Sequence, residues 1–143
     1  MQEELVQYSR SKGVALTAYS PLGSSDSPLL SNPLVTKVAE KYGVSPANVL
    51  ISLQANRPDV AGASPMYLSS PMRVLIASTV LTKSVTPERV IQNFKIIDLT
   101  DDEIAELNDL EKTAPFRACY PWWAGWGDLG FPDCRAMGPP RSL

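Results

Sequence analysis

The chain has 143 residues, 44% of them hydrophobic, and a formal net charge of −2. This length fits one ordinary domain, and the slight negative charge gives no general attraction to nucleic acid or to an anionic membrane surface. Because the chain contains no histidine and only two cysteines, Cys119 and Cys134, it offers no imidazole for proton transfer, no usual zinc site and no disulfide scaffold. We therefore expect a cytoplasmic protein without a bound metal ion, and no apolar run approaches the length of a membrane span.

Apolar periodicity and helix-start signals define the elements in the first half of the chain. A short amphipathic pattern stops at Gly13, an apolar run follows it, and Ser45 stands before Pro46 as a helix cap does. We expect, in order, a helix over 2–12, a buried strand over 14–19, a turn over 20–23, a loop over 24–33, and helices over 34–42 and 46–56.

The second half begins with a stretch, 59–78, in which Pro, Ser, Ala and Gly are interleaved and almost no periodicity is visible. Further along, Thr100 and Glu103 stand at the spacing of a capping box. We expect a strand over 80–82, helices over 87–95 and 99–112, and an irregular tail over 115–143.

Strands that alternate with helices indicate a parallel sheet in an α/β fold. Two strands do not complete a sheet of that kind, because both of its faces and both of its edges need cover. We therefore expect the chain to be part of a larger α/β fold.

Cationic and hydroxyl side chains gather between the second expected strand and the helix that follows it. Lys83 and Arg89 carry positive charge, Ser84 and Thr86 carry hydroxyls, and Pro87 suits the first position of a helix. Together with the unpaired N–H groups of a helix N-terminus, these residues predict a site for a phosphate. The alternative is a well-capped surface helix with scattered basic residues.

Several motifs resemble the C-terminal part of the aldo-keto reductases. Two of them are Ala18-Tyr19-Ser20-Pro21-Leu22-Gly23-Ser24 and the run from Lys83 to Asn93. Residues 32–57 resemble the family's helix pair before its last strand, and residues 99–110 resemble its late extra helix. Residues 120–134 resemble the tail of its fungal glycerol dehydrogenase-like branch. The resemblance implies that the chain is the last, incomplete part of a (β/α)8 TIM barrel. About the last two strands and their helices would lie in residues 1–114, with an atypical insertion at 59–78, and an irregular loop and tail would follow over 115–143.

The resemblance also implies NADPH as the cofactor and assigns residues to its parts. Tyr19 would stack on the nicotinamide, while Ser20 and Leu22 would line the path of the pyrophosphate. The residues implied at the adenosine end all lie in the second motif. Those that would hold the 2′-phosphate are Lys83, Ser84, Thr86 and Arg89, with Val85 in the same run, and those that would meet the adenine are Gln92 and Asn93. Without the resemblance, a tyrosine in an apolar strand is more typical of a core aromatic.

The family reduces small aldehydes or ketones to alcohols through an Asp, Tyr, Lys and His tetrad that precedes the matched motifs. This sequence has no histidine, so we expect no catalytic residue in it and little or no reductase activity from the chain alone. The aromatic residues Trp122, Trp123 and Trp126 would belong to the loop over the substrate pocket, or would form a satellite cluster.

Three functions remain open on these grounds. The chain is a fragment of an NADPH-dependent reductase that keeps part of the cofactor site, a non-catalytic module that binds NADP or associates with a full-length homologue, or an unstable product in which 59–78 derives from mis-splicing. Segment 38–53 also imitates a helix-turn-helix, but only Asn48 of its second helix could read base edges, so we expect no nucleic-acid partner.

Overall fold

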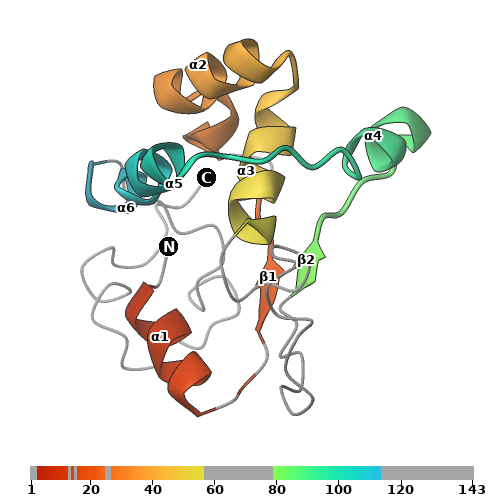
Figure 1. The fold of residues 1–143 in the computed structure, drawn as a ribbon. Helices are drawn as coiled ribbons and strands as arrows, with labels where there is room; N and C mark the ends of the chain where they lie inside the picture. Colours follow the sequence, from red (N-terminus) through yellow and green to blue (C-terminus); the bar gives the residue numbers. More distant parts are fainter. Residues whose placement is uncertain (1–2, 13, 15, 25–26, 57–78, 114–143) are drawn as a thin grey trace, which may run out of the picture.

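The computed structural model describes residues 3–12, 14, 16–24, 27–56 and 79–113 of the chain (Figure 1). Within these ranges, two short strands and several helices follow one another in the alternating order that the sequence predicts. The elements are α1 (Glu3–Ser11), β1 (Thr17–Tyr19), the 3-10 helix η1 (Pro28–Ser31), α2 (Pro33–Tyr42), α3 (Pro46–Ala55), β2 (Thr79–Leu81), α4 (Pro87–Gln92), α5 (Asp101–Asn108) and α6 (Leu110–Thr113).

The two strands pair in parallel, as the alternation of strands and helices predicts. Thr17 lies opposite Thr79, Ala18 opposite Val80, and the pair Tyr19 and Leu81 closes the ladder. Figure 1 shows the strands side by side with α3 adjoining them, and α3 contacts β2. Parallel pairing places the carboxyl ends of both strands, and the loops that leave them, at the same edge of the sheet.

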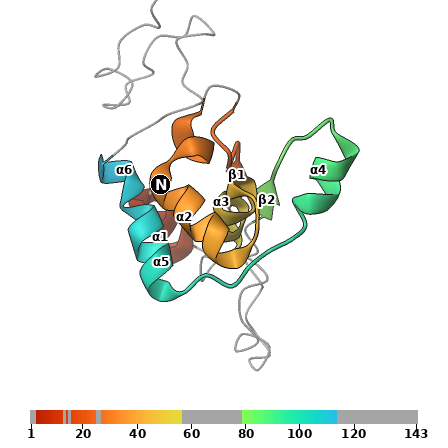
Figure 2. The same cartoon turned by 90° about the horizontal axis from the view of Figure 1, so that it is seen from above.

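The hydrophobic core lies among α2, α3, α5 and the segment that leads into α5. Helix α2 contributes Val35 and Val38, and most of the side chains of α3 from Asn48 to Leu53 are buried. The buried cluster comprises Val35, Val38, Ala39, Val49, Leu50, Leu53, Leu99 and Leu107. Helix α3 is therefore central to the described core; it contacts α2, and α2 in turn contacts α5 (Figure 2).

Side-chain caps define the starts of the core helices. The Oδ1 atom of Asn32 accepts a hydrogen bond from the Leu34 N–H at 2.9 Å where α2 begins. The hydroxyl of Ser45 accepts one from the Asn48 N–H at the start of α3, as predicted. The capping box of Thr100 with Glu103 opens α5, which is also as predicted.

Several of the expected elements differ from those in the structure. Segment 14–19 is not a buried strand: β1 has three residues, and Tyr19 lies on an exposed face with Thr17, because side chains alternate across a strand and only Ala18 lies on the other face. The expected loop at 24–33 contains η1, where Ser27 caps and Pro28 takes the first position. The helix expected over 87–95 ends at Gln92.

The helix expected over 99–112 is interrupted at Asp109, whose backbone N–H caps α5, and the chain continues as α6. Several further sequence predictions lie outside the described residues, namely the insertion at 59–78, both cysteines and the tail with Trp122, Trp123 and Trp126. Within the described ranges, the helices are too short and too polar to cross a membrane.

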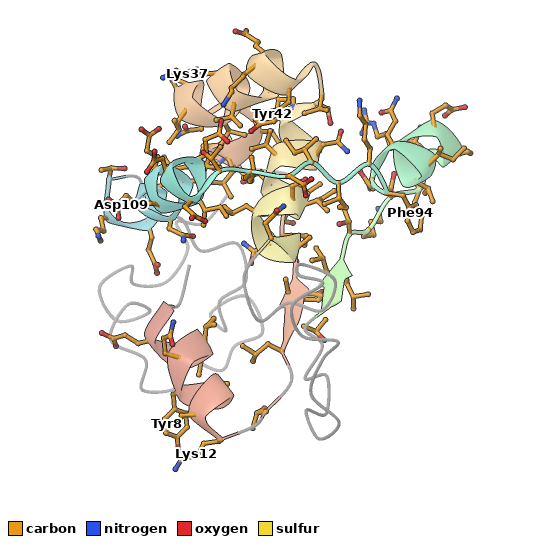
Figure 3. The ribbon with its side chains drawn as sticks, viewed as in Figure 1. Tyr8, Lys12, Lys37, Tyr42, Phe94 and Asp109 are labelled. Atoms are coloured by element: carbon orange, nitrogen blue, oxygen red, sulfur yellow. The ribbon has the colours of Figure 1, made fainter. Side chains whose placement is uncertain are left out.

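Glu103 joins the start of α5 to the end of α2. Its carboxylate accepts hydrogen bonds from Lys41 at 2.7 Å, from the Tyr42 hydroxyl at 2.8 Å and from the Thr100 N–H at 2.9 Å. Burial opposes ionisation of Glu103, but the hydrogen bonds from Lys41, Thr100 and Tyr42 outweigh it and lower its pKa from 4.5 to about 2. The side chain of Tyr42 at the end of α2 is labelled in Figure 3.

We predict that ionised Glu103 stabilises the fold and that its contribution is lost in acid. Because its pKa is about 2 when folded and 4.5 when unfolded, the contribution is fully present above pH 4.5 and falls away as the pH drops toward 2. The measurement is the difference in melting temperature between the wild type and Glu103→Gln as a function of pH. The difference should be constant near neutrality and shrink below pH 4.5, whereas Glu106→Gln on the same helix should give no such trend. A difference independent of pH would contradict the prediction.

Candidate functional site

The candidate site lies at the carboxyl edge of the two paired strands. Tyr19 ends β1 and Leu81 ends β2, opposite each other in the ladder. Both side chains are open to solvent, at 77% and 58% exposed. The carboxyl ends of parallel strands are where α/β proteins place their ligands, because loops with free backbone groups converge there. The interpretation of Tyr19 as a core aromatic is therefore wrong for the described structure.

The loop that leaves β1 is a tight turn with unusual backbone geometry. Ser20 and Ser24 have positive φ angles of 52° and 68°, and Gly23 between them has φ 78°. The Gly23 N–H donates to the Ser20 carbonyl at 2.9 Å, and the side chain of Leu22 packs against the hydrophobic core. Leu22 thus fixes the loop to the core, and the two serines adopt a conformation that non-glycine residues keep only where the surroundings hold it.

The loop that leaves β2 presents hydroxyl groups at the start of α4. Thr86 holds the N-cap position, but its own hydroxyl makes no capping hydrogen bond. The hydroxyl of Ser84 accepts the Thr86 N–H at 3.2 Å. Ser84 therefore orders the loop, and the Thr86 hydroxyl is not used for capping.

Two cations flank these hydroxyls. Lys83 and Arg89 are exposed, and the structure shows neither of them in an ion pair with another described residue. Glu88 is also exposed in the first turn of α4, so the local charge is not purely positive. A lysine, an arginine and two hydroxyls form a donor set that suits a phosphate group. Because α4 has six residues rather than the nine expected, these side chains, and not a helix dipole, carry the fit to an anion.

The structure brings most of the predicted site residues to one region of the fold. Lys83, Ser84, Val85, Thr86 and Arg89 follow β2, and Tyr19 and Ser20 reach the same edge through the pairing of β1 with β2. Leu22 differs, because its side chain is partly buried and packs against the hydrophobic core. Gln92 ends α4 and Asn93 caps it. Trp122, Trp123 and Trp126 lie outside the described residues.

Sequence reasoning missed the role of three polar residues on α3. Asn48 does not face solvent, as a residue that reads base edges would, because it is 3% exposed and its amide nitrogen donates to the carbonyls of Gln92 and Lys95. Ser52 and Asn56 bond the backbone of Ile97. The signal was present in the sequence as polar residues four apart in an otherwise apolar helix, which lie on one face.

No family model matches the chain, but individual proteins do. D-galacturonate reductase of Hypocrea jecorina is 41% identical over 137 residues, which cover 92% of this chain and 38% of that protein. Glycerol 2-dehydrogenase (NADP(+)) of Saccharomyces cerevisiae is 35% identical over 124 residues, which cover 86% of this chain and 34% of that protein. An aldo-keto reductase of the silkworm Bombyx mori has a TM-score of 0.64 at 25% identity, over 99% of this chain and 39% of its own.

A further solved structure, an aldo-keto reductase complexed with NADPH, has a TM-score of 0.63 at 23% identity and shows a likeness of fold. The chain belongs to the aldo-keto reductase family. It spans little more than a third of the length of the curated relatives above. The resemblance drawn from the motifs is thereby confirmed, and the solved relatives belong to a family whose fold is a TIM barrel.

We predict that Gly23 is required for the loop that follows β1. A Cβ atom at this position would lie 2.7 Å from the Cβ of Ser27, and the positive φ angle is itself unfavourable for alanine. Gly43 is a matched control, because it has φ 60° but no atom within 4 Å of the place that a Cβ atom would take. Urea unfolding of Gly43→Ala should show a loss of about 1 kcal/mol. Gly23→Ala should lose on the order of 3 kcal/mol, since steric overlap is added. Equal losses in the two variants would contradict this assignment.

Proposed function

We propose that this chain carries part of the NADP(H)-binding site of an aldo-keto reductase and does not itself reduce carbonyl compounds. The observation that carries the proposal is the parallel pairing of Tyr19 with Leu81, which brings the loops of both family motifs to one edge of the sheet. In this proposal Lys83, Ser84, Thr86 and Arg89 hold the adenosine 2′-phosphate, and the exposed ring of Tyr19 stacks on the nicotinamide.

Each group has a physical part in this arrangement. The guanidinium of Arg89 and the ammonium of Lys83 neutralise the phosphate, and the Thr86 hydroxyl, which makes no capping bond, donates to a phosphate oxygen. Ser84 holds the backbone of the loop through the Thr86 N–H. Ser20, Leu22 and Val85 shape the path between the two ends of the nucleotide, and Gln92 and Asn93 stand at the adenine. The names of the relatives support this choice of cofactor, since one is an NADP(+) dehydrogenase and one was solved with NADPH.

NADPH, when bound, supplies the hydride that family members transfer to an aldehyde or ketone. The chain's own residues bind and orient the cofactor in this proposal, and we assign none of them a proton-transfer role. The sequence contains no histidine for the family's tetrad. We propose that residues 1–114 are the last part of a (β/α)8 barrel, with 59–78 as an insertion, and that 115–143 form a loop and tail with Trp122, Trp123 and Trp126 in the substrate loop.

A second candidate function is association with a full-length homologue in the cytoplasm. It is favoured by apolar side chains that stay exposed at the strand ends and on α4. Tyr19, Leu81, Val85, Ile91 and Phe94 are all more than half exposed, and a surface of this kind is unusual for an isolated soluble domain.

We predict that the chain binds NADP+ more tightly than NAD+ and that Lys83 and Arg89 cause the difference. Each substitution, Lys83→Ala or Arg89→Ala, should weaken NADP+ binding about tenfold and leave NAD+ binding unchanged, because a charge-assisted hydrogen bond to the 2′-phosphate is lost. Isothermal titration of the full chain with both nucleotides provides the measurement.

The matched control for this titration is Lys37→Ala, which removes an exposed lysine from α2 (Figure 3). It should leave both affinities unchanged. Equal binding of NADP+ and NAD+ by the wild type would overturn the proposed cofactor site. A chain without a cooperative unfolding transition would instead support the unstable-product hypothesis.

We also predict that the purified chain does not reduce glyceraldehyde with NADPH. Without a positioned proton donor, hydride transfer to a carbonyl loses the contribution of general acid catalysis, typically about 10²–10⁴-fold, and the larger contribution of positioning. The measurement is the rate of NADPH oxidation with and without glyceraldehyde, with a full-length reductase as the positive control. Turnover clearly above the buffer rate would refute the inactive assignment.

A further inference from the structure

Helix α4 carries the proposed phosphate-binding residues but has no packed core of its own. It has six residues, none of them buried, and Phe94 just beyond it is 82% exposed. Figure 2 shows α4 standing apart from the packed helices, and Figure 3 shows Phe94 at its end. An isolated helix of this length is not stable in water. Its position must therefore be set by the segments on either side.

The segment before α4 is fixed by the pairing of β2, and the segment after it is fixed by α3. The buried amide of Asn48 donates from Nδ2 to the carbonyl of Gln92 at 2.7 Å and to that of Lys95 at 2.9 Å. These carbonyls belong to the last residue of α4 and to the turn that follows, where a helix leaves its acceptors without intrahelical partners; the Gln92 carbonyl also accepts the Lys95 N–H at 2.9 Å. The Oδ1 atom of Asn48 is held in turn by the Ser45 hydroxyl.

Two further residues on the same face of α3 continue this row of contacts. The Ser52 hydroxyl accepts the Ile97 N–H at 3.0 Å, and Nδ2 of Asn56 donates to the Ile97 carbonyl at 2.7 Å. Asn48, Ser52 and Asn56 are four residues apart and therefore lie on one face of the helix. We call these three side chains the α3 polar row. They bind backbone atoms, so the position of residues 92–97 is set by α3 itself.

We propose that the α3 polar row positions α4, and with it the 2′-phosphate site, relative to the strand edge; this inference rests on the function proposed above. The row touches no nucleotide in this proposal, so its members are positioning residues. Asn48 and Ser52 are almost wholly buried, so these contacts are anchored in the core of the fold and not on its surface. Loss of the row frees α4 to move, and Lys83 and Arg89 no longer converge on one phosphate.

The test is the ratio of NADP+ to NAD+ affinity in variants of the full chain. Asn48→Ala should lower this ratio about tenfold, because it releases both carbonyls next to α4. Asn56→Ala should lower it about threefold, since its contact lies further from α4. NADP+ affinity should fall more than NAD+ affinity, because the adenine is common to both nucleotides and only NADP+ carries the 2′-phosphate, whereas a merely structural loss would weaken both nucleotides alike.

The matched control is Asn32→Ala. It removes an asparagine that caps α2 through the Leu34 N–H and that makes no hydrogen bond with the described residues 92–97. It should lower stability about as far as a lost cap does and leave the affinity ratio within twofold of the wild type. Ser52→Ala provides a second variant that preserves side-chain volume, so the inference stays testable if Asn48→Ala does not fold. It should lower the ratio about threefold.

Hydrogen exchange provides a readout that needs no nucleotide. The amides of Val90 and Asn93, which bond the carbonyls of Thr86 and Arg89 within α4, should exchange at least tenfold faster in Asn48→Ala or, should that variant not fold, in Ser52→Ala. The amide of Ile104 in α5 should be unchanged. Unchanged exchange in α4, or an unchanged affinity ratio in folded Asn48→Ala or Ser52→Ala, would overturn the inference. A wild type with no preference for NADP+ would overturn the proposed function, and the exchange result would still decide whether the row positions α4.

Discussion

The constraint on which the rest of the structure depends is the burial of polar side chains on α3. Asn48 and Ser52 lie inside the protein at 3% and 0% exposed, beside Val49 and Leu53 of the core. A buried amide or hydroxyl must have a hydrogen-bond partner, because leaving it unpaired costs about 1–3 kcal/mol. The partners here are backbone groups of the segment that connects α4 to α5. The central helix of the core thereby also determines the course of a chain segment that has little packing of its own.

The segment that connects α4 to α5 also fixes the position of α5 and, through α5, that of α2. After Ile97 is bonded to Ser52, Leu99 enters the hydrophobic core, and Thr100 caps α5 with Glu103. Glu103 then accepts hydrogen bonds from the end of α2. Polar contacts and apolar contacts alternate along this path, so α3, α5 and α2 are fixed relative to one another by both kinds. Single surface ion pairs stabilise little, but Glu103 also serves as part of a cap, and its depressed pKa reflects several donors acting together.

Features that depend on neighbouring residues could be predicted from the sequence, and those that depend on distant residues could not. Ser45 with Pro46, and Thr100 with Glu103, mark helix starts through contacts three residues apart. The parallel pairing of the strands also followed from their alternation with helices. The end of α4, the exposure of β1 and the role of Asn48 depend on contacts across the fold. The bonds from Asn48 to Gln92 and Lys95 join residues 44 and 47 positions apart, beyond the reach of any local pattern.

The candidate site shows the same division between local and distant causes. The motifs that resemble the family predict which side chains would face a phosphate, and a turn with positive φ at Ser20 and Gly23 is a local feature. The motifs do not indicate that the Ser84 hydroxyl accepts the Thr86 N–H or that the Thr86 hydroxyl makes no capping hydrogen bond. They also place the residues proposed at the 2′-phosphate on or just before a helix of six residues with none buried. High affinity for a phosphate requires that the hydrogen-bond donors are fixed in position before the phosphate binds. The rigidity of this site must therefore come from outside the motif. Helix α3 contacts the end of the motif through its buried polar side chains, and its packing in the core can supply that rigidity.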